Sequence, residues 1–590
     1  MTLCALLLSI ARLANAADGL PPGEPLLARD STTAAHIRVR SDLAASQWIP
    51  VAGQTFSKAV RVETKKRPAH PYEIQICFPT IAAVAKGDVL LASFFARATS
   101  TPPGTSEATV ATVFERAGPP YEKSLQVTLS VTQQWQPFQL PFRAEQSLEA
   151  GQGQLSFQLG YDPQCVEIGR VELTSYGRQM DIHALPATQL GYRGREADAP
   201  WRRAAAERIE RYRKGPIKVT VLDAEGRPVE DADVRVTMTQ HAFGWGSAVT
   251  ADLLTADTAD SRKYRETVRK LYNKVVFEND LKWPTWQREG NRPAVFTAIR
   301  WLEESGIGVR GHCLVWPSWR RMPRDVQRLA DESAALRKRV NEHITEEVTA
   351  LRGKLVEWDV INEPYTNHDA MDVLGRSAMV EWFRLAHEAD AGVQLYVNDY
   401  AILAAGGRDR AHQDHYEQTI RYLLDQGAPL QGIGLQGHFG SDLTPPERLI
   451  EILDRFAKFG IPLQVTEHDI DVTDEQLQAD YTRDFLTAMF GHPAVKGLLT
   501  WGFWEGRHWR PNGAYFRRDW SIKPAGQAWL DLVLNAWWTR FSGSTDDTGK
   551  VATRGFLGEY EIVATKGGAR QTEKVTLSTG GAKVTIKLLQ

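Results

Sequence analysis

The sequence predicts an α/β protein whose main part is a (β/α)₈ barrel with antiparallel β-sandwich regions before and after it. Between residues 241 and 540, strand-like apolar runs alternate with helical stretches eight times, and about 300 residues is a usual length for such a barrel. On either side, short alternating runs separated by Gly, Pro and Ser turns predict antiparallel strands instead. The 590 residues therefore indicate a chain of several domains.

The amino terminus predicts a cleavable secretory signal over residues 1–16. Residues 3–10 form a short apolar centre, and Ala14-Asn15-Ala16 has the A-x-A pattern of a cleavage site. The positive charge that usually precedes the apolar centre is missing. We therefore expect a secreted or periplasmic protein. The sequence leaves open whether Cys77 and Cys165 pair in such an oxidising compartment.

Residues 17–180 are expected to form an antiparallel β-sandwich. Runs such as 125–131 and 154–159 alternate apolar and polar side chains between turn residues. With the strand that contains Trp135 and Phe138, this pattern resembles the jelly-roll carbohydrate-binding modules of secreted polysaccharidases. The resemblance implies a polysaccharide ligand. The alternative is a packing domain that binds nothing.

A small β-sandwich, split in the sequence, is predicted around the barrel. A polar stretch and a charged helix over residues 181–215 lead into residues 216–240, which alternate like two strands of a hairpin. Such a hairpin is too small to be stable alone. Runs of the same kind recur only over residues 551–590. We infer that the two segments pair and bracket the catalytic barrel at residues 241–540.

The candidate functional residues are those that follow the barrel strands, because barrel enzymes keep their sites at the carboxyl ends of the strands. No Gly-rich dinucleotide fingerprint favours an open sheet over a closed barrel. The eight predicted strands centre on residues 243–249, 274–277, 308–311, 355–360, 393–397, 433–435, 463–466 and 497–500.

Two of these strands end on a glutamate, Glu363 and Glu467. A carboxylate at the end of a buried parallel strand is poorly placed for stability and well placed for chemistry. Hydrolysis of a glycosidic bond requires two such carboxylates, one as proton donor and one as nucleophile or base. The alternative is a pair of structural carboxylates in salt bridges. The other side chains at these strand ends favour the catalytic interpretation.

Asp469 follows two positions after Glu467, and polar and aromatic residues also follow the remaining strands: Glu278, Asn279, Lys282, His312, Trp316, Asn398, Asp399, Gln436, His438, Trp501 and Trp509. Any one of these histidines and tryptophans could be a core residue, but their joint occurrence after successive strands favours a site. His412 and His415 are spaced like metal ligands, yet no third ligand is near. We expect a solvent-facing helix surface there, and no metal or organic cofactor. Cys313 is expected to be a buried thiol that points away from the site.

In order along the chain, the motifs E-N-x-x-K, R-G-H-x-L-V-W, W-D-V-x-N-E, N-D-Y, Q-x-H and T-E-x-D resemble those of family-10 glycoside hydrolases, the retaining endo-β-1,4-xylanases. The likeness covers all eight strands of residues 241–540. It implies that Glu363 is the acid/base and Glu467 the nucleophile. It also implies glycone subsites lined by Glu278, Asn279, Lys282, His312, Trp316, Asn362, Gln436, His438, Trp501 and Trp509.

Physical chemistry agrees with these implied roles. Asn362 can hydrogen-bond the 2-hydroxyl of the reacting sugar. Ionised Glu467 holds a proton on Glu363, because two nearby negative charges disfavour each other. Asp469 lies on the same strand face as Glu467 and, with His438, could keep the nucleophile ionised. Asn398 and Asp399 are expected to contact the residues that hold the glutamates rather than the sugar itself.

The chain departs from the family pattern in two loops. After Trp316 the family usually has His and, two positions later, Gln, where this chain has Pro317 and Trp319. Residues 502–508 contain no counterpart of an Asp that is common in the family. Both loops border the glycone pocket, so they bear on substrate preference.

We predict a secreted, monomeric, retaining endo-β-1,4-xylanase that hydrolyses xylan or a related β-glycan. The net charge of −2 and the lack of a basic stripe exclude a nucleic-acid partner, and no apolar run after the signal is long enough for a membrane. One alternative is the same mechanism on another β-glycan or on short xylo-oligosaccharides. Another is a non-catalytic polysaccharide-binding protein, which would usually have lost one of Glu363, Glu467, Asn362 or His438.

Overall fold

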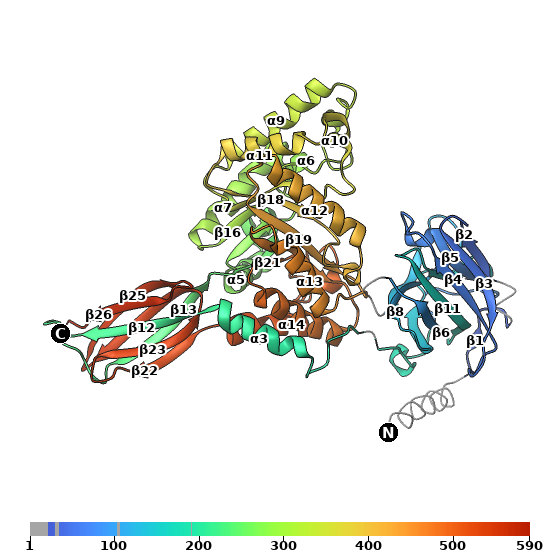
Figure 1. Cartoon of the computed structure of the whole chain (residues 1–590), viewed down its shortest axis with the longest axis horizontal. Coiled ribbons are helices and arrows are strands. Elements are labelled where there is room, and N and C mark those ends of the chain that lie inside the picture. Colours follow the sequence, from blue (N-terminus) through green and yellow to red (C-terminus); the bar gives the residue numbers. More distant parts are fainter. Residues whose placement is uncertain (1–21, 30–34, 103–106, 190, 590) are drawn as a thin grey trace. The chain divides into compact units, whose positions relative to one another are not determined.

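The computed structural model describes residues 22–29, 35–102, 107–189 and 191–589 (Figure 1). The secretory signal predicted over residues 1–16 lies outside the described residues. The chain divides into two compact units, residues 1–190 and 191–590, and each is described by itself. Within the described ranges, none of the helices has the length and apolar character that crossing a bilayer requires.

The first unit is a sandwich of two antiparallel sheets, as predicted. One sheet has the order β3–β4–β11–β6–β9, with β1 paired to β11, and the other has the order β2–β5–β10–β7–β8. The strands are β1 (Glu24–Pro25), β2 (His36–Val39), β3 (Ala44–Pro50), β4 (Lys58–Thr64), β5 (Ile74–Pro79), β6 (Val89–Ser100), β7 (Ala108–Arg116), β8 (Lys123–Val131), β9 (Gln136–Arg143), β10 (Gly153–Gln158) and β11 (Gln164–Ser175).

The core of this unit lies between the two sheets, because every second side chain of a strand points to the same face. Val60, Ala96 and Ile168 are buried there. The odd-numbered neighbours of these residues point away from the core. Cys77 lies in one sheet and Cys165 in the other, and both are free thiols.

The second unit contains the predicted (β/α)₈ barrel. Eight parallel strands form a closed ring in chain order, and β21 pairs with β14 to complete it. They are β14 (Gly244–Val249), β15 (Lys274–Phe277), β16 (Gly308–Gly311), β17 (Glu357–Asn362), β18 (Gln394–Asp399), β19 (Gly432–Phe439), β20 (Leu463–Ile470) and β21 (Val495–Thr500). Each of the eight strands overlaps a predicted strand.

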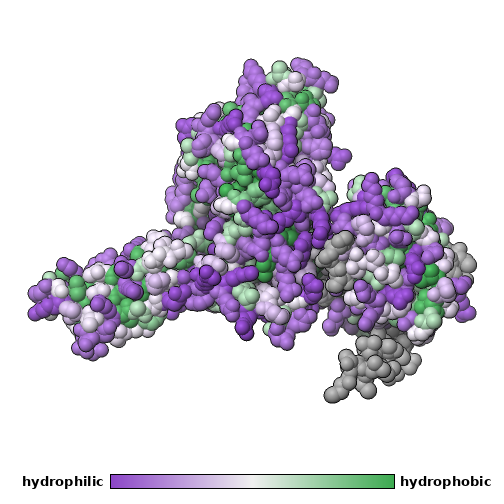
Figure 2. All heavy atoms as spheres, in the orientation of Figure 1, coloured by the Kyte–Doolittle hydropathy of each residue, from purple (hydrophilic) through white to green (hydrophobic). Residues whose placement is uncertain are grey.

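Amphipathic helices follow the strands and surround the ring (Figure 1). The main ones are α5 (Ala259–Leu271), α7 (Arg292–Glu304), α9 (Ser333–Ala350), α11 (Ala378–Ala389), α12 (Arg410–Asp425), α13 (Pro446–Ala457), α14 (Glu475–Gly491) and α15 (Pro524–Trp529). Further short helices lie in the loops: α4 (Ala251–Thr255), α6 (Trp283–Trp286), α8 (Arg324–Gln327) and α10 (Asp369–Leu374). On the face shown in Figure 2, hydrophilic side chains predominate and apolar ones are interspersed among them.

Charged side chains fill part of the barrel interior. Arg310 of β16 is fully buried and forms ion pairs with Glu357, at 2.7 Å, and with Asp359. Lys274 and the side-chain amide of Gln464 also contact Glu357. Burial opposes ionisation of Glu357, but the charges of Lys274 and Arg310 outweigh it and lower the pKa of Glu357 to about 2. The interior charges are therefore paired, as buried charges must be.

A small β-sandwich brackets the barrel, as predicted. Its sheets have the orders β23–β12–β26 and β22–β13–β24–β25. The strands are β12 (Lys214–Leu222), β13 (Asp233–His241), β22 (Arg540–Ser544), β23 (Lys550–Phe556), β24 (Gly558–Lys566), β25 (Ala569–Leu577) and β26 (Ala582–Lys587). The predicted hairpin of residues 216–240 is wrong: β12 and β13 belong to different sheets and each finds its partners near the carboxyl terminus. Strand β22 was not predicted.

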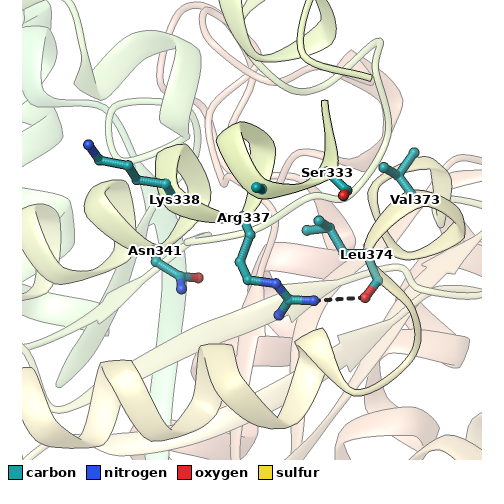
Figure 3. Close-up of a pocket in the computed structure, with 7 residues that line it drawn as sticks. Ser333, Arg337, Lys338, Asn341, Val373 and Leu374 are labelled. Carbon is teal, nitrogen blue, oxygen red and sulfur yellow. Dashed lines mark hydrogen bonds between the residues drawn. The ribbon is translucent and has the colours of Figure 1, made fainter. Parts of the chain in front are cut away.

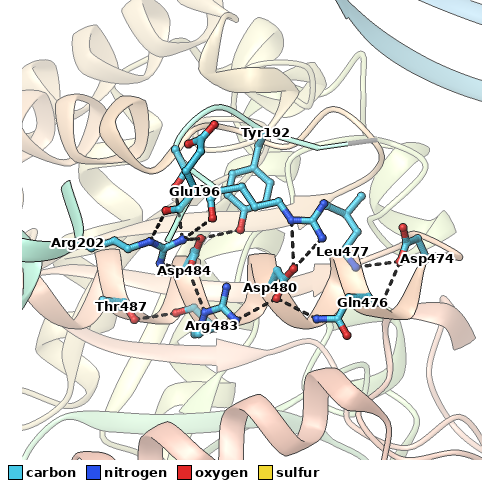
Figure 4. Close-up of polar contacts among 12 residues, drawn as sticks. Tyr192, Glu196, Arg202, Asp474, Gln476, Leu477, Asp480, Arg483, Asp484 and Thr487 are labelled. Carbon is cyan, nitrogen blue, oxygen red and sulfur yellow. Dashed lines mark hydrogen bonds and ion pairs between the residues drawn. The ribbon is translucent and has the colours of Figure 1, made fainter. Parts of the chain in front are cut away.

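The segment before this sandwich is attached to the barrel rather than being a loose linker. Helix α3 (Pro200–Tyr212) packs against α14. Arg202 donates two hydrogen bonds to fully buried Asp484, at 2.6 and 2.7 Å, and Tyr192 donates a third at 2.7 Å (Figure 4). Arg195 makes a matching pair with Asp480 one helical turn earlier. Residues 192–202 are thus clamped onto α14.

This clamp can be tested by removing Arg202. We expect Arg202→Met to lower the free energy of unfolding by about 1.5–3 kcal/mol, because buried Asp484 loses its two-pronged cationic partner. Arg203→Met is the matched control, since Arg203 and its partner Glu207 are 89% and 69% exposed, and we expect a change within about 0.5 kcal/mol. Chemical denaturation of both variants measures the difference. Equal stabilities would contradict a clamp.

Candidate active site

The two predicted glutamates lie at the same end of the barrel. Glu467 is inside β20, and Glu363 directly follows β17. Glu363 has a φ of 55°, a left-handed conformation that is rare for a residue with a side chain. Its backbone N–H donates to the carbonyl of Asn398 at 2.8 Å, which helps to hold this conformation. Strained backbone of this kind clusters at functional sites.

The surroundings of Glu467 favour its ionised form. Its Oε1 accepts a hydrogen bond from Nδ2 of Asn398 at 2.9 Å, and its Oε2 lies 3.2 Å from Nε2 of His438. Burial alone would raise the pKa of Glu467. The hydrogen bond from His438 and the charges of His312, His438 and Lys282 outweigh burial, so the pKa of Glu467 is lowered.

His438 is itself held in the charged form by Asp469. Nδ1 of His438 lies 3.0 Å from Oδ2 of Asp469, which also accepts a hydrogen bond from Nε1 of Trp509 at 2.6 Å. Burial opposes the charge of His438, but Asp469 and Glu467 raise its pKa to about 9. Burial likewise opposes the charge of Asp469, and His438 lowers its pKa to about 2. At neutral pH, the imidazolium therefore donates to both carboxylates.

The surroundings of Glu363 favour its protonated form. Burial raises its pKa, and the charge of Glu467 raises it further. These two effects outweigh the hydrogen bond that Nε2 of Gln436 donates to Oε1 of Glu363 at 3.0 Å, which lowers the pKa. Nδ2 of Asn367 donates to Oε2 of Glu363 at 3.3 Å. Asn367 lies in the loop after β17 and was not predicted. It belongs to no motif, so the sequence carried no signal for this contact.

Asn362 connects the two glutamates. It immediately precedes Glu363, and its Oδ1 accepts a hydrogen bond from the same Asn398 amide that contacts Glu467. Thr466 fixes the orientation of Asn398 by donating to its Oδ1 at 2.7 Å. Nδ2 of Asn362 is buried and has no partner among the described residues. A free, buried amide donor beside the two carboxyl groups is suited to a ligand hydroxyl.

Aromatic rings connect the predicted subsite residues into one wall. Ring centroids are 6.3 Å apart for His312 and Trp316, 5.1 Å for His312 and Trp501, 6.2 Å for Trp501 and His438, and 4.9 Å for His438 and Trp509. Trp501 is largely buried against Ala248, Val276 and Leu499. Trp509 is 47% exposed and thus accessible to a ligand.

The residues after β15 also adjoin this wall. The Lys282 ammonium is 5.2 Å from the centroid of Trp316 and 5.9 Å from that of Trp501, and it donates to Oδ1 of Asn279. Glu278 is near enough to feel its charge, although burial dominates and raises the pKa of Glu278. The predicted residues from β15 to β21 therefore gather around one end of the barrel.

Asp399 does not contact either glutamate. It is buried and lies 3.2 Å from Nε2 of His412, and Tyr365 stacks on the His412 ring at 3.9 Å. His412 is only 1% exposed, so the predicted solvent-facing surface is wrong for this residue. Among the described residues, no group of three or more His, Cys, Asp or Glu side chains is arranged to hold a metal ion.

The two loops that depart from the family pattern are anchored by polar contacts. The backbone N–H of half-buried Trp319 donates to Oδ2 of Asp369 of α10 at 2.8 Å. Arg507 pairs with Asp252 at 2.8 Å, and Glu505 pairs with Lys523 at 2.6 Å. The charges of Arg507 and Glu505 are therefore neutralised within the protein.

A separate hollow lies between α9 and α10 (Figure 3). Its volume is about 490 Å³, and Arg337, Lys338 and Asn341 contribute polar groups to it. Arg337 donates to the carbonyl of Leu374 at 2.9 Å. None of the predicted site residues lines this hollow, so it is distinct from the glutamate pair.

The chain is similar in sequence to a known enzyme family and to several curated proteins. The family model of glycosyl hydrolase family 10 matches residues 236–532. The chain is 32% identical over 400 residues to the anti-sigma-I factor RsgI6 of Acetivibrio thermocellus, a match that covers 66% of this chain and 50% of that protein. It is 28% identical over 356 residues to endo-1,4-beta-xylanase 1 of Arabidopsis thaliana, covering 60% and 36%. The chain thus spans half or less of the length of these curated relatives.

A similar solved structure is that of native xylanase 10B from Thermotoga maritima, with 25% identity and a TM-score of 0.45 over 50% of this chain and 96% of that one. The residues matched by the family model make up half of the present chain and contain all eight barrel strands and both glutamates. The chain therefore belongs to glycosyl hydrolase family 10.

Proposed function

We propose that the protein is a retaining endo-β-1,4-xylanase with Glu363 as acid/base and Glu467 as nucleophile. The observation that carries this proposal is the opposite shift of the two carboxyl groups: the pKa of Glu363 is raised, chiefly by burial, and that of Glu467 is lowered by His438 and neighbouring charges. Environments that push two carboxyl pKa values apart assign one group as acid and the other as base or nucleophile.

In the first step, Glu467 attacks the anomeric carbon while Glu363 gives its proton to the departing glycosidic oxygen. The bond between sugar and leaving group breaks, and an ester bond to Glu467 forms. The free Nδ2 of Asn362 is available to bond the 2-hydroxyl of the reacting sugar, a contact that strengthens in the transition state. Asn398 and His438 keep the attacking carboxylate oriented and ionised.

In the second step, water hydrolyses the glycosyl ester. Once Glu467 is esterified, its negative charge no longer raises the pKa of Glu363. Glu363, which has given up its proton, can then accept one from the attacking water. Amide donors from Gln436 and Asn367 stabilise the ionised form that this step requires.

The alternative outside the enzyme class is a protein that binds polysaccharide without cleaving it. One relative is named as an anti-sigma factor and not as an enzyme, so we retain this alternative. Against it stand both glutamates, Asn362 and the charged His438 with its hydrogen bonds. Within the enzyme class, the alternative substrates are other β-glycans and short xylo-oligosaccharides.

The decisive experiment is proton NMR of early products from purified protein on a panel of xylans and glucans. We expect xylan cleavage with the β-anomer formed first. An α-anomer would overturn the retaining assignment, and no cleavage of any polymer or oligosaccharide would favour the binding-only role.

The two glutamates should be separable by their substrates. Glu467→Ala should abolish turnover of every substrate, because no covalent intermediate can form. Glu363→Ala should reduce xylan cleavage by about 10²–10⁴-fold but spare the first step on aryl glycosides whose leaving group needs no proton. Burst kinetics on an activated aryl xylobioside measure this step. Equal losses on both substrate types for both variants would contradict the roles.

The hydrogen-bonded series Asp469–His438–Glu467 predicts how kcat/KM depends on pH. Without the charge of Asp469, the pKa of His438 falls from about 9, the nucleophile loses its cationic neighbour, and the pKa of Glu467 rises. We expect the acidic limb of kcat/KM to move to higher pH in Asp469→Asn. Asp471→Asn, two positions further along the chain, is the control and should leave the limb in place. A limb that stays unchanged in Asp469→Asn would refute the coupling.

Trp319 is predicted to exclude hexoses. Glucose differs from xylose by a C6 hydroxymethyl group, so discrimination depends on filling that space, and Trp319 is bulkier than the glutamine it replaces. We expect wild type to prefer aryl β-xylobioside to aryl β-cellobioside in kcat/KM, and Trp319→Ala to lose about 1–3 kcal/mol of that preference. Exposed Arg320→Ala should keep it. An unchanged preference in Trp319→Ala would show that this residue does not guard the pocket.

Export is proposed from the sequence alone. If residues 1–16 are a signal, the mass of the mature protein should correspond to a chain that begins near residue 17. Intact-mass measurement of protein expressed with its own amino terminus in a host with a secretion system checks this.

A further inference from the structure

The outward face of the β3–β4–β11–β6–β9 sheet carries a row of charged residues opposite the core. Glu167 of β11 is flanked in register by Arg61 of β4 and Arg97 of β6. The neighbours of these three residues along each strand, such as Val60 and Ile168, belong to the core. Because strand side chains alternate, the three charged side chains share the face that points away from it.

The three side chains are linked by hydrogen bonds, and the two arginines remain accessible. Glu167 is completely buried, and accepts a hydrogen bond from Nε of Arg61 at 2.8 Å and from Nε of Arg97 at 2.6 Å. The guanidinium side chains themselves are 37% and 34% exposed. Glu63, two residues from Arg61, adds a second negative charge beside it. The two arginines and the two glutamates therefore balance in charge. The buried carboxylate of Glu167 fixes the orientation of both guanidinium groups.

Three half-buried aromatic rings adjoin this row: Phe56, Phe95 and Trp135. Phe56 lies 5.2 Å from Phe95 and 5.1 Å from Trp135, and the guanidinium of Arg97 is 4.9 Å from the Trp135 centroid. These rings are outside the core of the sandwich. A Cβ on Gly169 would come within 2.3 Å of the Phe56 ring, so the ring packs closely against the sheet at a position where only a glycine leaves room for it. Together with Arg61, Arg97 and Glu167, the rings form what we call the Trp135 patch.

The other end of the same face is built differently. There Val89 and Leu91 are covered by Leu185 and by the half-buried side chains of Tyr176, Met180 and Ile182. The chain thus folds back over the part of the face where aliphatic side chains need burial. At the Trp135 patch, aromatic rings stay half-exposed beside oriented polar groups. That combination is typical of a ligand site rather than of packing.

We propose that the Trp135 patch binds an uncharged β-linked polysaccharide chain. A pyranose ring presents apolar C–H groups on its flat face, which suit aromatic rings, and hydroxyl groups at its edge, which suit guanidinium donors. The balanced charge of the patch favours a neutral polymer over an acidic one. The choice of xylan as that polymer rests on the function proposed for the barrel.

The test uses the full chain carrying Glu467→Gln, so that polymer is not consumed during the measurement. Depletion assays with insoluble xylan and cellulose measure retention of this protein and of its Trp135→Ala, Trp135→Phe and Trp48→Ala derivatives. Trp48 is the matched control, since it is 37% exposed and lies on an edge strand of the same sheet. We expect at least a tenfold rise in Kd for Trp135→Ala, partial recovery in Trp135→Phe, and less than about a twofold change for Trp48→Ala.

Each outcome decides the proposal. Equal retention of Trp135→Ala and Trp48→Ala would overturn it, because all binding would then come from elsewhere in the chain. Stronger binding to a uronic acid-rich polymer than to a neutral one would overturn the ligand class. Self-association that Trp135→Ala abolishes would identify a protein partner instead. Turnover of an aryl xylobioside by each Trp variant, in the background with Glu467 intact, reports on the barrel separately, so failure of its proposed function is distinguishable.

Discussion

The ion pairs of Arg310 inside the barrel are the interaction on which the site depends. This guanidinium is fully buried and pairs with Asp359 and with Glu357, which Lys274 also contacts. Asp359 in turn contacts Nδ1 of His312 at 2.9 Å, and His312 packs against Trp501. The buried ion pairs thus hold the imidazole ring of His312, which lines the site at the end of the barrel. His312 and Trp501, which line the site, are thus connected to this buried network through Asp359.

The glutamate pair shows how two identical side chains acquire opposite properties. Both are buried, so desolvation acts on both in the same direction. The difference comes from their charged partners: Glu467 is beside the imidazolium of His438, whereas Glu363 is beside the negative charge of Glu467, which together with burial outweighs the hydrogen bond from Gln436. Asp469 is essential to this asymmetry because it keeps His438 charged. The alternating charges of Asp469, His438 and Glu467 therefore determine which carboxyl group of the site carries a proton.

The sequence was sufficient for the barrel and for the residues at the strand ends, because period, strand order and motif spacing are local properties. It was insufficient where a contact depends on loop conformation or on burial. The loop after β17 brings Asn367 into contact with Glu363, and no sequence motif predicts this contact. His412 looked solvent-facing from its helix spacing, but Tyr365 and Asp399 cover it. The alternation of β12 and β13 correctly indicated strands, yet two strands in opposite sheets alternate just as two strands of a hairpin do.

The split sandwich has a consequence for biosynthesis. The backbone N–H of Ala232 in this sandwich bonds Oγ1 of Thr545, 313 positions later in the chain. During translation, β12 and β13 leave the ribosome long before their partners exist. Closure of the barrel brings the two ends of the intervening segment together and so removes most of the entropic cost of joining them. A nascent chain that stops short of β23 would carry a complete barrel beside open strand edges, the state most prone to aggregation. Strands β23–β26 therefore cover these open edges once they are synthesised.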